Sequence, residues 1–133
     1  MGLSFCVQKV EETGVRFSYS GFNDFRHRIA RSIGLKDIAI GDKETDIYFT
    51  GRYMEIENSH PMYPLIDHED NDGDLGPDDC GMVGSYLRIL IEEWKSELGT
   101  SSDIYLEQDI EMGEKLANVM LQCHANNNTL LFL

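Results

Sequence analysis

The sequence predicts an α+β fold: a single mostly helical domain, residues 1–133, with a small antiparallel sheet. Along residues 3–20, apolar and polar side chains alternate as they do in strands. Further along, three segments repeat apolar residues every three or four positions, which is the period of a helix face. A short apolar segment at the C-terminus is typical of a last strand. Since 41% of the 133 residues are apolar, the chain suits one hydrophobic core rather than two.

An N-terminal hairpin is expected from strands over residues 3–10 and 14–20. β-branched and aromatic residues alternate with polar ones along both segments. Residues 11–14 between them end in a glycine, which suits a turn. The two strands therefore form the start of the predicted antiparallel sheet.

The first helix is predicted from Gly21 to Ile33, with Ser20 as its N-terminal cap and Gly34 at its end. Its apolar residues follow spacings of three, four and four, at Phe22, Phe25, Ile29 and Ile33. Its outward positions then carry basic side chains, at Arg26, His27, Arg28 and Arg31. We therefore predict that Arg26, Arg28 and Arg31 either bind a phosphate or an acidic partner, or complement the acidic groups of the same molecule.

The remaining elements follow from proline, glycine and apolar spacing. Residues 35–66 contain two glycines and two prolines, which indicates loops around a short strand near residues 47–50. A second helix is predicted from Pro77 to Leu98, because proline favours the first helical position and one apolar stripe follows it. A third helix is capped by Ser101 or Ser102 and ends at residues 126–128. Residues 129–133 then form a strand that could join the N-terminal hairpin.

Three small residues stand in the first half of the second helix, at Gly81, Gly84 and Ser85. Glycine in a helix interior costs up to about 1 kcal/mol relative to alanine, so these positions need a compensating reason. We expect another backbone to pack closely against this half of the helix.

Composition excludes several classes of protein. The chain has 11 Lys and Arg against 24 Asp and Glu, a formal charge of −13 that opposes nonspecific binding to nucleic acid or anionic lipid. No apolar run is long enough to cross a bilayer, and the N-terminus lacks the basic and apolar regions of a signal peptide. Cys6, Cys80 and Cys123 are an odd number without a CxxC pair, which excludes a zinc-finger framework and favours a reducing compartment. We therefore expect a cytoplasmic protein with no membrane association.

The strongest candidate site is residues 67–79, with seven acids and no base. Gly73 aligns with the turn glycine of a twelve-residue calcium loop, and the second helix begins beside the last ligand position. Ligand positions 1, 3, 5, 7 and 12 are then filled by His68, Asp70, Asp72, Asp74 through its carbonyl, and Asp79. With histidine at position 1 and aspartate rather than glutamate at position 12, a calcium site here should be weak, with a Kd of roughly 10⁻⁴–10⁻³ M.

Three hypotheses for these acids stay open. They form a solvated turn whose carboxylates complement the helix dipole, or a structural site for calcium or another divalent cation, or a catalytic metal site. An imidazole with carboxylates suits Mn²⁺, Fe²⁺ or Zn²⁺, so His68, Asp70 and Asp72 could also centre a metal-dependent hydrolase. No other cofactor is expected, because the sequence contains none of the common nucleotide-binding or hydrolase motifs.

Two segments resemble a known family. SYSGFNDFR at residues 18–26 and HEDNDGDLGPDDC at residues 68–80 are similar to motifs, SYSGFxxFR and HSDCDGELTPEEC, of a loosely defined family of small uncharacterised proteins from bacteria and phages. The likeness spans most of the chain from Ser18 onward, and it implies no activity. This sequence departs from the second motif at Gly76, where the family has threonine, and at Asp79, where it has glutamate.

The leading prediction is therefore a small acidic, non-enzymatic binding or regulatory protein of bacterial or phage origin. Its partner would be a protein or a small ligand that the sequence does not identify. One alternative is a phage-type inhibitor that mimics the charge of nucleic acid or sequesters a small ligand, which a charge of −13 allows. The other alternative is the metal-dependent hydrolase.

Overall fold

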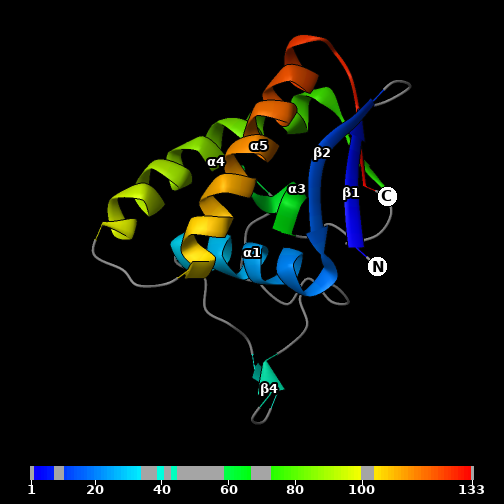
Figure 1. Cartoon of the computed structure of the whole chain (residues 1–133). Coiled ribbons are helices and arrows are strands. Elements are labelled where there is room, and N and C mark those ends of the chain that lie inside the picture. The colour runs from blue at the N-terminus through cyan, green and yellow to red at the C-terminus, as the bar shows by residue number, and fades with distance from the viewer. Residues whose placement is uncertain are drawn as a thin grey trace.

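The computed structural model describes residues 2–7, 11–33, 39–40, 43–44, 59–66, 73–99 and 104–132. The fold is α+β, as predicted, with helices packed against one face of an antiparallel sheet (Figure 1). Helices hold more of the described residues than strands do. No helix in the described part of the chain is long and apolar enough to span a membrane.

The main sheet has four strands, β1 (Gly2–Val7), β2 (Glu11–Ser18), β5 (Asp74–Leu75) and β6 (Leu130–Phe132). They lie in the order β2-β1-β6-β5, and every neighbouring pair is antiparallel. The predicted hairpin and its junction with the C-terminal strand are both confirmed.

The position of the hairpin turn was predicted wrongly. Residues 11 and 12 belong to β2, where Glu11 pairs with Val7 and Glu12 with Cys6. The register shifts between Ser4 and Cys6, so the ladder is irregular at its middle. Residues 8–10, which connect the strands, lie outside the described residues.

Helix α1 (Tyr19–Ser32) follows β2 directly. Its N-terminal cap is Ser18, whose backbone is extended and whose Oγ accepts a hydrogen bond from the Gly21 amide at 2.9 Å. The predicted cap, Ser20, lies inside the first turn instead. The helix therefore starts two residues earlier than the sequence indicated, because β2 ends at Ser18 rather than at residue 20.

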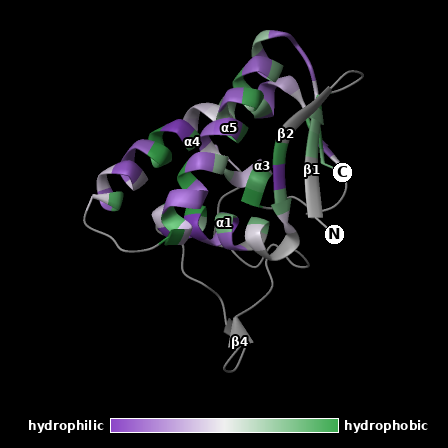
Figure 2. Cartoon of the chain, in the orientation of Figure 1, coloured by the Kyte–Doolittle hydropathy of each residue, from purple (hydrophilic) through white to green (hydrophobic). Residues whose placement is uncertain are grey.

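The core lies between α1, the sheet and the helix pair α4 (Pro77–Leu98) and α5 (Ile104–Ala125). The bounds of α4 match the prediction, whereas residues 100–103, with the proposed caps Ser101 and Ser102, lie outside the described residues. Hydrophilic residues follow the outer sides of both helices in Figure 2. The centre of the core is a group of aromatic rings in mutual contact at centroid distances of 4.7–6.2 Å, from Phe5, Phe17, Phe22, Phe25 and Phe132.

Close docking of α4 onto α5 through small residues is confirmed at Gly81 and Gly84, whereas Ser85, the third small residue of the prediction, is exposed. A Cβ atom added at Gly84 would lie 3.0 Å from the Met120 Cβ and 3.3 Å from the Ala117 carbonyl oxygen. A Cβ atom at Gly81 would lie 2.5 Å from the His124 Nδ1. Real Cβ atoms essentially never come that close, so α5 occupies the space that larger side chains would need.

The central segment contains structure that the sequence did not predict. Helix α3 (Tyr63–Ile66) buries Leu65 and Ile66 against the core, and the preceding Met62 is buried too. The strands β3 (Ala39–Ile40) and β4 (Lys43–Glu44) pair with each other, where loops were expected. The strand predicted near residues 47–50 lies outside the described residues.

Candidate functional site

The acidic segment is described only in its second half. His68, Asp70 and Asp72 lie outside the described residues, so their ligand roles stay predictions. Asp74 lies in β5 and Asp79 in the first turn of α4, and both side chains are exposed. Among the described residues, no three His, Cys, Asp or Glu side chains gather as a metal centre.

The backbone after the acidic segment agrees with the calcium-loop alignment. Gly73, the predicted turn glycine, has a φ of 96°, a conformation that side chains rarely allow. Phe132 N donates to the Gly73 carbonyl at 3.0 Å, and Asp74 then faces Leu131 across the ladder. Because hydrogen-bonded and non-hydrogen-bonded pairs alternate in an antiparallel ladder, the Asp74 carbonyl turns away from β6. That carbonyl is the predicted ligand at position 7.

The first turn of α4 also agrees with the hypothesis that the acids form a solvated turn with no metal bound. The N-terminal cap of α4 is Gly76, which has no side chain to accept a hydrogen bond from the first backbone amides. Asp78 and Asp79 lie in the first turn. Carboxylates there are favoured by the partial positive charge of the helix N-terminus. The carboxylate of Asp79 therefore has a stabilising role whether or not a cation is bound.

The predicted outward basic face of α1 is wrong for two of its members. Arg26 is 0% exposed: its guanidinium lies 4.5 Å from the centroid of the Phe22 ring, and Nη1 donates to the Leu65 carbonyl at 3.3 Å. His27 is also buried. The period placed both residues on the outward side of the helix, but α3 packs near α1 and supplies the carbonyl that accepts from Arg26.

The other two basic residues of α1 differ from each other. Arg28 Nε donates to Asp109 Oδ2 of α5 at 2.6 Å, in an ion pair whose side chains are only 16% and 13% exposed. Arg31 is exposed. Arg26, Arg28 and Arg31 therefore do not form one exposed surface. The alternative prediction, that these residues complement acidic groups of the same molecule, holds for Arg28.

His60, His124 and Cys80 have structural contacts at α4. His60 accepts a hydrogen bond from the Met62 amide on Nδ1 and packs its ring on Tyr86. His124 holds the Pro77 carbonyl at 3.0 Å from Nδ1, which must carry the proton because a carbonyl only accepts. Burial, followed by the nearby Cys123, raises the pKa of the Cys80 thiol to about 12. Cys80 is thus a protonated thiol at neutral pH rather than an activated nucleophile.

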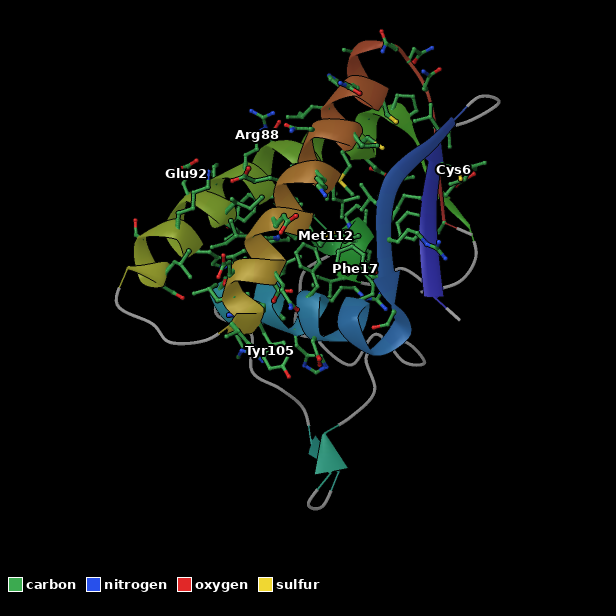
Figure 3. The ribbon with its side chains drawn as sticks, viewed as in Figure 1. Cys6, Phe17, Arg88, Glu92, Tyr105 and Met112 are labelled. Atoms are coloured by element: carbon green, nitrogen blue, oxygen red, sulfur yellow. The ribbon has the colours of Figure 1, made fainter. Side chains whose placement is uncertain are left out.

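The sequence did not predict an open hollow of about 420 Å³ between the outer sides of α4 and α5. Two polar contacts cross it: Arg88 Nη2 donates to Asn118 Oδ1, and Lys95 Nζ lies 2.5 Å from Glu114 Oε1. Figure 3 shows Arg88 and Glu92 projecting from α4 on this side, away from the sheet. The hydrogen bond that Lys95 donates to Glu114 raises the pKa of Lys95, which stays charged. The hollow is lined by Arg88, Ile89, Ile91, Glu92, Lys95, Glu114 and Asn118.

One apolar side chain at the hollow is exposed. Ile89 is 58% exposed, and Met82, two helical turns earlier on the same side of α4, is 37% exposed. Ile89 interrupts the polar face of α4 that carries Arg88 and Glu92. That interruption is the sequence signal that could have indicated this surface.

Comparisons with protein-family models, with curated proteins and with solved structures gave no match to this chain. The acidic segment and the α4–α5 hollow are the features of the chain that indicate a function.

Proposed function

We propose that the chain is a non-enzymatic binding or regulatory protein, and that its partner is a protein presenting basic side chains around an apolar group. The observation that carries this proposal is the exposed Ile89 at the edge of the α4–α5 hollow. An apolar group of the partner would cover Ile89 and remove both surfaces from water.

Charge supports the same choice of partner. The charged residues that line the hollow balance, with Glu92 and Glu114 against Arg88 and Lys95, but the whole chain carries a formal charge of −13. Basic side chains of a partner would be attracted to a molecule of this net charge, and acidic ones repelled. Because surface charges are screened by salt, the association should weaken as ionic strength rises.

Affinity capture from the source cell tests the proposal with a matched pair of variants. The two isoleucines Ile89 and Ile104 are 58% and 65% exposed, and only Ile89 lines the hollow. We expect Ile89→Lys to weaken binding of a basic partner at least about tenfold, and Ile104→Lys to leave it unchanged. A partner held equally well by Ile89→Lys would contradict the proposal.

We propose, as a second candidate function, that residues 68–79 bind calcium weakly. The specific observation is the positive φ of Gly73 together with an Asp74 carbonyl directed away from β6. Binding of calcium to the folded state alone would stabilise it by RT ln(1 + [Ca²⁺]/Kd), about 1.4 kcal/mol at ten times Kd. That corresponds to a rise of a few degrees in the melting temperature.

Asp79 and Asp78 give a matched test of the calcium site. Both are exposed acids in the first turn of α4, but only Asp79 occupies a predicted ligand position. We expect Asp79→Asn, like Asp72→Asn, to abolish the rise in melting temperature with calcium, and Asp78→Asn to retain it. If calcium leaves the melting temperature of the parent unchanged beyond an ionic-strength control, the acids form a solvated turn. Manganese or zinc exceeding calcium would implicate His68, with the effect fading below about pH 6.

A further inference from the structure

Cys80 and Cys123 are 43 residues apart in the sequence and in contact in the fold. Cys80 lies at the start of α4 and Cys123 near the end of α5, and a hydrogen bond joins the two thiols. Both side chains are buried, at 0% and 1% exposure. The two sulfur atoms are therefore held next to each other within the core.

Four elements meet at this thiol pair. The Cys80 Sγ lies 3.5 Å from the Leu75 carbonyl of β5 and also hydrogen-bonds the backbone of Leu130 in β6. Leu75 and Leu130 pair directly with each other in the sheet. A covalent bond between the thiols would thus fix both helix ends at the edge of the sheet.

Glycines of α4 lie at the helix contact next to the two cysteines. Packed helices usually have their axes 8–10 Å apart, whereas a disulfide requires Cα atoms about 4.4–6.8 Å apart. Next to Cys80, Gly81 leaves no room for a Cβ atom beneath the ring of His124, the residue next to Cys123. Gly84 meets Met120 one turn further along in the same way. At both glycines, α5 therefore occupies the space that a larger side chain of α4 would need.

We propose that Cys80 and Cys123 form an intramolecular disulfide when the folded chain meets a disulfide oxidant such as oxidised glutathione. One thiolate attacks the glutathione disulfide, giving a mixed disulfide and releasing one glutathione thiolate. The second thiolate then attacks the protein sulfur of that mixed disulfide and releases the other glutathione. Overall, two protein thiols become one disulfide, and one glutathione disulfide is reduced to two thiols.

Burial sets the rate of this reaction. The pKa of both thiols is raised, mainly by burial, so few thiolates exist at neutral pH, and attack requires the first turn of α4 to open. Cys6 is half-buried and lies on the side of β1 away from the helices (Figure 3). Cys6 is therefore expected to react first, and the slow reaction is the one within the pair.

The bond should stabilise the folded chain. It closes a segment from residue 80 to residue 123, which reduces the freedom of the unfolded chain. For a domain of this size, we expect a rise of roughly 10 °C in the melting temperature, reversed by a reductant.

The test uses the full chain with Cys6→Ala, so that the more accessible thiol of Cys6 does not compete. The protein is kept folded in excess oxidised glutathione, denatured without reductant, and analysed by thiol titration and peptide mass mapping. We expect both thiols to disappear, a cross-linked peptide pair containing Cys80 and Cys123, and the higher melting temperature. Adding Cys80→Ala or Cys123→Ala should abolish the cross-link, leaving one free thiol or one mixed disulfide.

Three results would overturn the proposal. The two thiols could remain free in the folded chain while pairing readily after denaturation. Each could instead carry its own glutathione. A cross-link with an unchanged or lowered melting temperature would show that the native packing does not accommodate the bond. Each result is read on the Cys6→Ala chain alone, so the outcome does not depend on whether the alanine variants of the buried cysteines fold.

Discussion

The pair of helices α4 and α5 is packed differently along its length. Where α4 begins and α5 ends, glycines let the helices touch, and Cys80, Cys123 and His124 fill the contact. Farther along, long polar side chains, Arg88 to Asn118 and Lys95 to Glu114, bridge a hollow. We call these the closed end and the open end. The difference separates two tasks on one helix pair: the closed end stabilises the fold, and the open end offers a surface.

The largest expected effect is a loss of stability at alkaline pH that originates at the closed end. The Cys80 pKa is raised from 9.0 to about 12 in the folded state, so the folded chain holds this proton more tightly than the unfolded chain does. The contribution of the Cys80 thiol to the free energy of unfolding is therefore complete below about pH 9, and it is lost as the pH rises from 9 toward 12. We expect the loss of this contribution to lower the free energy of unfolding by about 2 kcal/mol at pH 11.

Urea unfolding at neutral and alkaline pH checks this expectation against a matched variant. Cys80→Ala should remove most of the alkaline loss, whereas Cys6→Ala, at a half-buried cysteine of β1, should keep it. Equal alkaline losses in the parent and in Cys80→Ala would mean that other groups cause the decline and that the closed end does not hold this proton.

The next effect concerns the ring of His124 over Gly81. Alanine at position 81 would bring a Cβ atom to within 2.5 Å of Nδ1, so the ring must move and its hydrogen bond to the Pro77 carbonyl is lost. We expect Gly81→Ala to cost about 1 kcal/mol despite the better helix propensity of alanine. In a His124→Ala background, the same change should be neutral or stabilising. Additive effects in this double-mutant cycle would show that the contact does not form.

The smallest effect is expected at the open end. Lys95 and Glu114 are both nearly half exposed, and ion pairs in such positions contribute little because water and salt screen them. Lys95→Met and Glu114→Gln should therefore shift the urea midpoint less than Gly81→Ala does, with no resolvable coupling between them. A strong coupling would place this pair among the groups that hold the fold together and would erase the contrast between the two ends.

Local signals made most of the fold predictable. The bounds of α4 follow from Pro77, Gly99 and one apolar stripe, all of which act within the helix itself. Gly84 predicted close packing, because a glycine in a helix interior needs a reason. The cap of α1 was misplaced by two residues, since Ser18 and Ser20 are equivalent caps until the length of β2 is known.

What the sequence could not reveal depends on neighbours distant in the chain. Arg26 lies at an outward position of α1 by period, but the carbonyl of Leu65 and the ring of Phe22 surround it. The contact between Cys80 and Cys123 requires the register of α4 against α5, which no spacing in the sequence specifies. The hollow likewise needs side chains from both helices. The ligand roles of His68, Asp70 and Asp72 stay predictions.

Equilibrium urea unfolding of Gly84→Leu beside Ile89→Lys tests the contrast between the two ends most directly. A leucine at position 84 must displace Met120 and the backbone of Ala117, so we expect the free energy of unfolding to fall by about 1–3 kcal/mol. Ile89 is mostly exposed, so its replacement by lysine should leave the free energy of unfolding within about 0.5 kcal/mol of the parent. A parent-like Gly84→Leu, or an Ile89→Lys that unfolds at much lower urea, would contradict the assignment of stability to the closed end and of surface to the open end.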